Sequence, residues 1–553
     1  MPEKSNSITQ RFAFCVTVSL ALAAPLAISA AAVAESGPGI SLVGSAASSS
    51  GAEAGTQPDS LWLELEGYSS LEGSLKTAPP ESAGDLLARL RAGFTIEAGM
   101  NSQIQAQLNW FLKHPDYLER VFARAQRYMP YIVDELEQRG LPLELALLPI
   151  VESAYDPFAY SHGRAAGLWQ IIPGTARRFG IRQNWWYDGR RDVVDSTDGA
   201  LNYLAYLHGL MDGDWLLAVA SYNSGEGNVL RAVRNNRSRS LPVDFWYLKL
   251  PKETISYVPK LLALVEIVRD PAAFGIALPE LLDAPQFAQA DIGGQLDLAL
   301  AAELAGVDVD TLYAFNSGFN HWATDPEGPH RLVLPIDVSA SFNAALAALP
   351  EGERVRWQRH KVRNGDTLSG IADKYRTTIA AVKKANGISG NTIRAGSYLT
   401  VPVASKPLAE YSQSADSRLA KTQNRERKGE RVEHQVRSGE SFWSIGRRYG
   451  VGMRELAAWN GMAPRDTLAV GQKLVVWAKG VGKGAGPASA PAANGTTRKL
   501  HYTVRSGDSL YLIANRFRIT VSDLVRWNSI QKDKMLRPGQ KLTMYVDVTR
   551  QSG

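Results

Sequence analysis

Three segments of this 553-residue chain repeat one pattern, and this repeat limits the possible folds more than any other feature. The segments read VRNGDTLSGIADKY, VRSGESFWSIGRRY and VRSGDSLYLIANRF. An asparagine follows each turn glycine at an offset of 21 residues, and the pairs are Gly365 with Asn386, Gly439 with Asn460, and Gly507 with Asn528. Chance does not keep a register over this length. The sequence therefore predicts three copies of one small structural unit.

Each unit is predicted to fold as β-α-α-β. In the first unit, apolar residues at i, i+3, i+4 and i+7 indicate a helix, and Asn386-Gly387 is a typical helix end. Asp366 and Ser509 are predicted to be helix N-caps in their units. Low-complexity stretches between the units are predicted to be mobile linkers. The predicted boundaries are 359–403, 433–477 and 500–546 for the units and 404–432 and 478–499 for the linkers.

A fourth, eroded copy is predicted at residues 290–337. Apolar residues keep the helix spacing from Leu298 to Ala305, and Asn316 precedes a closing apolar strand. The segment lacks the Gly-Asp start and carries an insertion around His321. We therefore expect a unit that has lost its original binding role and packs on its neighbour.

Residues 85–280 have a different pattern, made of amphipathic segments of helix length such as 117–138 and 197–211. Strand-like alternation is nearly absent there, so this part is predicted to be one all-α domain. Residues 35–84 are rich in Ser, Gly, Ala and Pro and are predicted to be a flexible lead-in.

The first 34 residues have the order of a secretory signal peptide. Lys4 and Arg11 precede an apolar run that ends in Ala32-Val33-Ala34. An uncleaved membrane anchor is the alternative, because the run is long enough to span a bilayer. Cys15 lies near the start of the run, which is the wrong place for the lipidated cysteine of a lipoprotein.

Cys15 is the only cysteine, so the mature chain can have no disulfide, no thiol nucleophile and no cysteine-ligated metal. The eight histidines show no ligand-like spacing, and we expect neither a metal nor another cofactor. A net charge of +6 suits an acidic polymer as partner, and nothing in the sequence indicates nucleic acid.

Glu152 stands out in the stretch LPIVESAYDPFAYSHGRAAGLWQ because it ends an apolar run. Such a glutamate either points from a helix to water or is held in an apolar cleft, where its proton is useful. Burial of this kind raises a carboxyl pKa by disfavouring the charged form.

The three repeats resemble LysM modules, which hold polymers that contain N-acetylglucosamine, such as peptidoglycan and chitin. The resemblance implies a sugar groove beside the loop after the first strand and the loop after the second helix. Loop backbone amides and apolar side chains would make the contacts there. The sugar-binding residues that it indicates are Gly365, Asp366, Thr367, Gly439, Gly507, Asp508 and Ser509. Inert spacers are the alternative.

The helical domain resembles the lysozyme-like lytic transglycosylases of bacterial cell walls, of the membrane-bound lytic murein transglycosylase D type. The resemblance rests on LPIVESAYDP, AAGLWQIIPGTARRFG, DGRRDVVDSTDGALNYLAYL, DWLLAVASYNSGEG and DFWYLKLPKETISYVPKLLAL. It implies that Glu152 is the single catalytic acid and base, and that Ser153, Gln170, Tyr222 and Asn223 bind substrate. The predicted fold class is multidomain, with an all-α lysozyme-like domain followed by small α+β modules.

The resemblance implies cleavage of the MurNAc-GlcNAc β-1,4 bond with 1,6-anhydromuramic acid ends, in a periplasmic or envelope protein bound to the cell wall. Two alternatives stay open. A hydrolase of the lysozyme kind would need a second carboxylate, and Asp156 and Asp192 are the candidates. A catalytically silent scaffold that binds peptidoglycan is the other. In each case the expected partners of the protein are peptidoglycan strands, and membrane association stays open.

Overall fold

The computed structural model describes residues 84–161, 163–478, 497–505, 508–517, 519, 521–528, 530, 536 and 539–547. The predicted signal peptide, nearly all of the lead-in, most of the second linker and Gly507 lie outside the described residues. None of the helices in the described part combines the length and the apolar character needed to cross a bilayer.

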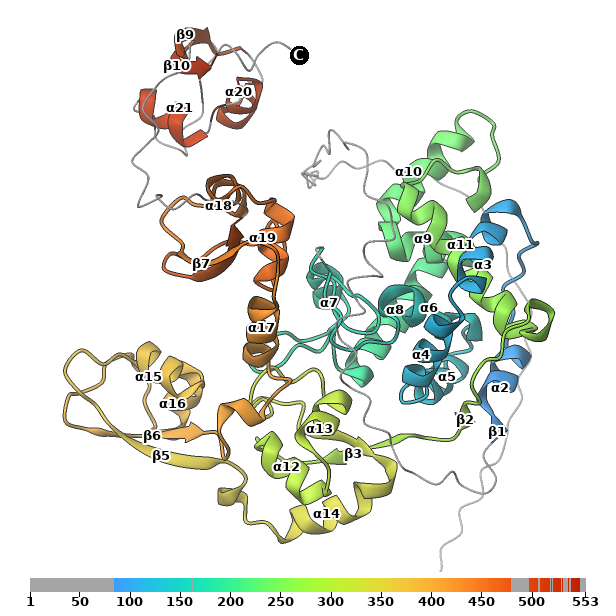
Figure 1. Cartoon of the computed structure of the whole chain (residues 1–553), viewed down its shortest axis with the longest axis horizontal. Coiled ribbons are helices and arrows are strands. Elements are labelled where there is room, and N and C mark those ends of the chain that lie inside the picture. The colour runs from blue at the N-terminus through green and yellow to red at the C-terminus, as the bar shows by residue number, and fades with distance from the viewer. Residues whose placement is uncertain are drawn as a thin grey trace, which may run out of the picture. The chain divides into compact units, whose positions relative to one another are not determined.

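Residues 84–283 form a helical domain in which the short strands β1 (Gly84–Asp85) and β2 (Leu282–Asp283) pair at its two ends (Figure 1). The α-helices are α2 (Leu86–Ala92), α3 (Ser102–Leu112), α4 (Pro115–Ala125), α5 (Met129–Gln138), α6 (Leu148–Ser153), α7 (Pro173–Arg178), α8 (Val193–Leu210), α9 (Trp215–Ser224), α10 (Glu226–Arg237) and α11 (Lys252–Arg269). The 3-10 helices are η2 (Leu143–Leu147), η3 (Phe245–Tyr247) and η4 (Ala272–Phe274).

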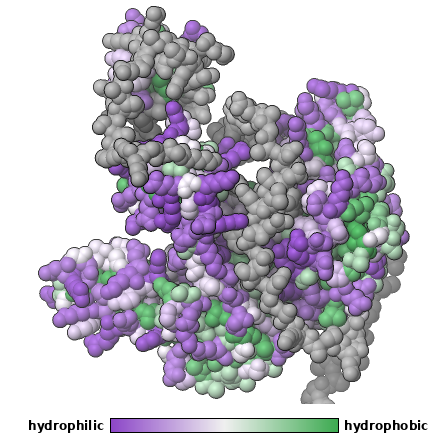
Figure 2. All heavy atoms as spheres, in the orientation of Figure 1, coloured by the Kyte–Doolittle hydropathy of each residue, from purple (hydrophilic) through white to green (hydrophobic). Residues whose placement is uncertain are grey.

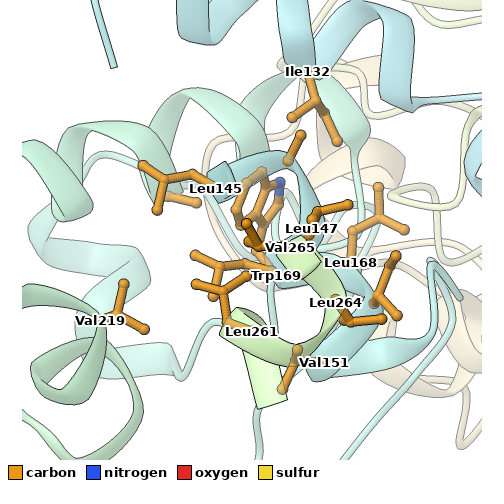
Figure 3. Packing of buried hydrophobic residues seen from close by; sticks show 14 of the residues in the cluster. Ile132, Leu145, Leu147, Val151, Leu168, Trp169, Val219, Leu261, Leu264 and Val265 are labelled. Carbon is orange, nitrogen blue, oxygen red and sulfur yellow. The ribbon is translucent and has the colours of Figure 1, made fainter. Parts of the chain in front are cut away.

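The core of this domain surrounds α6, the short helix that carries Glu152. Figure 3 shows Trp169 among apolar side chains of η2, α6 and α11. The indole is fully buried, and its Nε1 donates a hydrogen bond to Thr197 in α8 at 3.0 Å. Burying such large apolar surfaces is the main favourable contribution to folding. The apolar run before Glu152 therefore fixes α6 in the middle of the domain.

The next domain has the β-α-α-β order plus an additional helix. Its elements are β3 (Phe287–Asp291), α12 (Leu298–Ala305), α13 (Val309–Phe315), β4 (Arg331–Pro335), η5 (Ile336–Val338) and α14 (Ser339–Ala348), followed by η6 (Glu351–Glu353). β3 and β4 pair antiparallel. The domain is longer at both ends than the predicted eroded copy, because β3 begins before residue 290 and α14 packs on α12 after residue 337.

This domain shares a core with the helical domain. Phe287, Phe315 and Val333 belong to the same buried cluster as the helices around Glu152. In the other direction, Trp186 and Tyr187 of the helical domain are buried in the cluster of the β-α-α-β unit. The expectation that the eroded copy packs on its neighbour agrees with these contacts.

Three further modules follow the same order. The first has β5 (Arg356–Lys361), α15 (Leu368–Tyr375), α16 (Ile379–Ala385) and β6 (Tyr398–Val403). The second has β7 (Glu430–Gln435), α18 (Phe442–Tyr449), α19 (Met453–Trp459) and β8 (Lys473–Ala478). The third has β9 (Thr497–Thr503), α20 (Leu510–Arg516), α21 (Val521–Asn528) and β10 (Lys541–Asp547). Each strand pair is antiparallel.

The repeated asparagine has a structural cause. Asn386 ends α16, where its side-chain amide donates to the Val382 and Thr400 carbonyls and its oxygen accepts from the Thr400 backbone N–H, all at 2.7 Å. Asn460, Asn528 and Asn316 make the same three bonds in the other units. The amide thus joins the second helix to the closing strand, which explains the fixed offset.

Two predictions about this region were wrong. The N-cap of α15 is Thr367, whose hydroxyl accepts from the Gly370 backbone N–H, and Asp366 bonds elsewhere. The stretch 404–432 is not a mobile linker throughout, because it forms η7 (Leu408–Glu410) and α17 (Ala415–Asn424). Tyr411 between them is fully buried, and its hydroxyl donates to the Asp297 carboxylate at 2.9 Å. Ser509 caps α20 as predicted.

Candidate active site

Glu152 lies at the end of α6, where the chain leaves the helix abruptly. Ala154 and Tyr155 follow with φ of 51° and 59°, in the left-handed region that non-glycine residues rarely adopt. The fully buried Tyr155 holds this conformation, because its hydroxyl donates to the Ala146 carbonyl at 2.6 Å. Strain of this kind clusters at functional sites. The left-handed conformation of Ala154 and Tyr155 ends α6 directly after Ser153. Glu152 therefore lies on the last turn of a helix that otherwise lies inside the core.

The Glu152 carboxyl is half-buried and has a strongly shifted proton affinity. Burial raises its pKa to about 8, so it keeps its proton at neutral pH. The Tyr257 hydroxyl donates to Oε1 at 2.5 Å, which favours the charged form and opposes the shift. The negative charge of Glu253 raises the pKa further. A carboxylic acid that stays protonated and partly accessible is suited to proton donation.

The Gly167-Leu168-Trp169-Gln170 turn is joined to α6 by Ser153. The buried Ser153 hydroxyl donates to the Leu168 carbonyl at 2.8 Å. Gly167 has φ of 80°, and a Cβ there would lie 1.9 Å from the Arg190 carbonyl oxygen, so no other residue fits. Gln170 is half-buried, and its amide nitrogen donates to the Gly167 carbonyl at 2.9 Å.

Tyr222 and Asn223 lie on the last turn of α9. The Tyr222 hydroxyl donates to the Trp169 carbonyl at 2.7 Å. The ring lies close enough to Glu152 for the two to interact electrostatically, and its hydroxyl bonds to the turn rather than to the carboxyl. Asn223 accepts from the Thr254 hydroxyl at 2.8 Å, so α11 fixes the orientation of its amide.

The structure therefore brings together four of the five segments that carry the resemblance. Ser153 joins α6 to the turn, Tyr222 joins α9 to the same turn, and Asn223 contacts α11. The hydroxyls of Ser153 and Tyr222 are used inside this framework, whereas Gln170 and Asn223 keep part of their surface exposed.

Two residues of α11 were missed by sequence reasoning. Tyr257 is 105 positions from Glu152 and donates the hydrogen bond to its carboxyl. Glu253, one helical turn earlier, contributes the neighbouring negative charge. The available signal was the polar set Glu253, Thr254 and Tyr257 at i, i+1 and i+4, at the start of a helix that continues as the apolar run LLALV.

The two carboxylates considered as partners for Glu152 have other roles. Asp156 is buried and accepts from the Phe158 backbone N–H at 2.8 Å, so it caps the turn after α6. Asp192 is the N-cap of α8 and is bonded to Arg331 at 2.8 Å. Its side chain is almost wholly buried.

The predicted LysM site residues have mixed positions. Gly365 and Gly439 have φ of 89° and 79° at the turn, in keeping with their conformational role. Asp366 accepts from the Arg363 backbone N–H at 2.7 Å and from His360 at 3.0 Å, and Asp508 accepts from the Arg505 backbone N–H and the Tyr502 hydroxyl. These carboxylates thus shape the loop from within the module.

No group of three or more His, Cys, Asp or Glu side chains in the described part of the chain is arranged to hold a metal ion.

Comparison with known proteins identifies the parts of the chain. Residues 130–242 match the family Transglycosylase SLT domain, and residues 286–351 match the family Lytic transglycosylase MltD, LysM-like domain. Residues 360–402, 434–477 and 502–544 match the family LysM domain. The chain is 35% identical over 406 residues to membrane-bound lytic murein transglycosylase D of Escherichia coli (strain K12), covering 72% of this chain and 86% of that protein.

The chain belongs to the membrane-bound lytic murein transglycosylase D family. An autolysin of Enterococcus faecalis is 32% identical over 195 residues, covering 35% of this chain and 25% of the autolysin. The solved structure of an inactive mutant of the lytic transglycosylase Slt from Pseudomonas aeruginosa is 25% identical, covers 28% of this chain and 25% of that chain, and has a TM-score of 0.20.

Family membership confirms three predictions from the sequence: the family itself, the multidomain fold class and the enzyme class. The protein is a lytic murein transglycosylase whose LysM modules bind peptidoglycan. Trp169 of the Gly-Leu-Trp-Gln turn is buried in the core, and Ser221 of the Ser-Tyr-Asn segment is fully buried in α9.

Proposed function

We propose that Glu152 alone supplies both the acid and the base of the transglycosylase reaction, and that Tyr257 positions its carboxyl. The observation that carries this proposal is the half-buried Glu152 carboxyl, whose pKa is raised to about 8 by burial. Because the Tyr257 hydroxyl donates to Oε1, we assign the acidic proton to Oε2. That oxygen is then the donor to the glycosidic bond.

In the first step, the Oε2 proton of Glu152 goes to the glycosidic oxygen as the bond to C1 of muramic acid breaks. The leaving N-acetylglucosamine keeps that proton as its 4-hydroxyl, and an oxocarbenium-like sugar develops. In the second step, the Glu152 carboxylate takes the proton of the muramoyl C6 hydroxyl, whose oxygen bonds to C1. The product is a 1,6-anhydro ring, and Glu152 returns to its protonated form.

The substrate's own hydroxyl is the preferred nucleophile because it is tethered to the reacting sugar. Well-oriented intramolecular reactions reach effective concentrations of about 10⁵–10⁸ M, which lets the hydroxyl outcompete water. A hydrolase would instead place a second carboxylate across the sugar. Asp156 and Asp192 are bonded inside the protein, which disfavours that alternative.

Glu253 is the carboxylate that most deserves a test for a hydrolytic role. It is exposed at the start of α11 and interacts electrostatically with Glu152. Its position beside the Asn223 amide, at 3.5 Å, supports a role in orienting Asn223 and in keeping Glu152 protonated. We assign it that role and not the activation of water.

Digestion of purified peptidoglycan followed by mass spectrometry tests the reaction. We expect muropeptides that end in 1,6-anhydromuramic acid, because the tethered hydroxyl is the nucleophile. A main product with reducing muramic acid ends would show that water attacks, and would make the protein a hydrolase. The Glu253→Gln variant is the matched control, since it should give the same anhydro product if Glu253 activates no water.

The pH profile of kcat/KM should move in opposite directions in two variants of α11. Tyr257→Phe removes a hydrogen bond that favours the Glu152 carboxylate, so the pKa rises and the alkaline limb moves to higher pH. Glu253→Gln removes a negative charge that disfavours the carboxylate, so the alkaline limb moves to lower pH. This second shift should be the smaller, because Glu253 is exposed and screened by solvent.

Soluble glycan chains are the substrate for this measurement, because they avoid any change in wall binding. The assigned roles of Tyr257 and Glu253 would be contradicted if the alkaline limb moved in the same direction in both variants. The two residues would then not have opposite effects on the pKa of Glu152.

We also propose a periplasmic location, with export through residues 1–34 as a signal peptide. The enzyme class and the peptidoglycan-binding modules support a place in the cell envelope. Three LysM modules on one polymer would hold the enzyme to the wall by avidity, because each bound module raises the effective concentration of the others. The modules would bind N-acetylglucosamine through their loops. Attachment to the wall would then not require association with a membrane.

A further inference from the structure

The two-stranded sheet of the first LysM module has one face without helices. Helices α15 and α16 lie on the same side of β5 and β6 (Figure 1), and Leu399 and Val401 point to that side in the module core. Side chains alternate along a strand, so the neighbouring positions point away from the helices. In the observed register, this outer face consists of Trp357, Arg359, Lys361, Tyr398, Thr400 and Pro402.

Aromatic and basic groups are exposed together on the outer face. Trp357 is 47% exposed and Tyr398 is 53% exposed, so both rings present large apolar surfaces to a ligand. The Arg359 guanidinium carbon lies 4.5 Å from the centre of the Tyr398 ring. This cation–π contact fixes the guanidinium beside the ring while its N–H groups remain available as donors. Lys361 is exposed at the end of the same strand.

The surrounding module adds a strong positive charge. Residues 356–403 contain nine Lys or Arg against two Asp, whereas the helical residues 85–280 contain 21 basic and 22 acidic residues. Figure 2 shows this module, at the left of the view, mainly in the colours of hydrophilic residues. The excess charge is thus concentrated in a binding module and away from the catalytic domain.

We propose that the outer face binds the carboxylate-bearing stem peptides of peptidoglycan, next to the glycan held by the module's loops. This inference rests on the proposed function, because it assumes that the module is attached to that polymer. Guanidinium and ammonium groups pair with carboxylates, and aromatic faces pack on the backbone and side chains of an extended peptide. Six residues of strand extend about 20 Å, which matches a short peptide.

A bilayer fits the outer face less well. Interfacial segments insert aliphatic and aromatic side chains into the headgroup region. The outer face has no Leu, Ile, Val or Met, and the Tyr398 ring is in contact with Arg359. The second module makes a useful comparison within the chain. Aligned by its histidine His434, it has Glu433 where the first module has Arg359, so it should lack this binding.

The test uses the full chain carrying Glu152→Gln, so that the polymer is bound and not cleaved. Binding is measured on native sacculi and on sacculi whose carboxylates have been converted to neutral amides with carbodiimide and ethanolamine. Arg359→Gln on the outer face is compared with Lys374→Gln on α15, which removes the same charge from an exposed site on the helical side.

We expect Arg359→Gln to weaken binding to native sacculi about three- to fivefold, and Trp357→Ser to add to the loss. Arg359→Gln should not change binding to the amidated sacculi, because the carboxylates that pair with Arg359 have been neutralised there. The proposal is overturned if Arg359→Gln has no effect on native sacculi, if it weakens both polymers equally, or if Lys374→Gln has the same effect. Loss of binding only to phosphatidylglycerol vesicles would identify a membrane surface instead. A failure here leaves the anhydro product unaffected, so the two proposals are tested separately.

Discussion

Glu152→Gln is expected to abolish cleavage of peptidoglycan while leaving the fold and the binding of glycan nearly intact. The amide has almost the same size as the carboxyl but cannot deliver a proton to the glycosidic oxygen. General acid–base catalysis contributes about 10²–10⁴-fold, and the loss should reach the upper end of this range or exceed it, because one residue serves both steps. Release of soluble muropeptides from sacculi measures it.

The stability of the same variant provides the control for folding. The pKa of Glu152 is raised from 4.5 to about 8 in the folded protein, so the folded state binds the proton more tightly than the unfolded state. The resulting stabilisation is present below the unfolded pKa and is lost as the pH rises towards 8, at about 1.4 kcal/mol per pH unit. Gln has no such dependence.

Glu152→Gln should therefore unfold at a higher temperature than the wild type at pH 9, with a smaller difference at pH 5. If Glu152→Gln is inactive and shows this stability pattern, the substitution has removed the acidic proton without disturbing the fold. A variant that keeps more than about a tenth of the wild-type rate would show that Glu152 is not the acid. A variant less stable than the wild type at pH 9 would instead contradict the burial of the carboxyl.

Sequence reasoning identified the parts of the site that are encoded by contiguous residues. Glu152, Gln170 and Asn223 each lie in a short segment whose pattern is informative by itself, and the structure brings these segments together. Tyr257 was missed because its importance depends on the packing of α11 against α6, which no local pattern records.

The repeats show a similar division. A fixed offset from glycine to asparagine predicted repeated units, but not why the asparagine is needed. The structure shows that Asn386 joins the second helix to the closing strand, which is a structural role. Low complexity predicted mobility for residues 404–432, whereas burial of Tyr411 against Asp297 fixes part of that stretch. The composition of a segment describes its average behaviour and does not reveal that one residue, here Tyr411, is buried.

The LysM-like domain supports the active site through the segment 188–192. On one side, the Arg190 guanidinium donates to the Ile171 carbonyl at 3.2 Å, and its backbone packs against Gly167. On the other side, the Ser317 hydroxyl donates to the Arg191 carbonyl at 2.6 Å. The segment that contacts the Gly-Leu-Trp-Gln turn is therefore held by the neighbouring domain.

Arg331 provides the strongest of these connections. Its guanidinium donates to Asp192 at 2.8 Å and to Asp195 at 2.7 Å. Asp192 has a side-chain exposure of only 2% and also caps α8 through the backbone N–H groups of Val194 and Asp195. A buried carboxylate that loses its partner remains desolvated without compensation, which costs about 3–5 kcal/mol. Residue 331 therefore matters to a catalytic domain of which it is not itself a part.

Arg331→Met is expected to lower the free energy of unfolding of the helical domain by about 3–5 kcal/mol, and its melting temperature by roughly 6–20 °C. Asp192→Asn in the Arg331→Met background should recover much of this loss, because asparagine keeps the N-cap without the buried charge. Arg178→Met is the matched control, since its ion pair with Glu226 lies at the surface and is screened by solvent, so its loss should cost far less stability. Thermal unfolding followed by circular dichroism measures all three variants.

If Arg331→Met behaves like Arg178→Met, the LysM-like domain does not stabilise the helical domain. If the double variant recovers stability but not activity, the ion pair also sets the geometry of the turn beside Glu152.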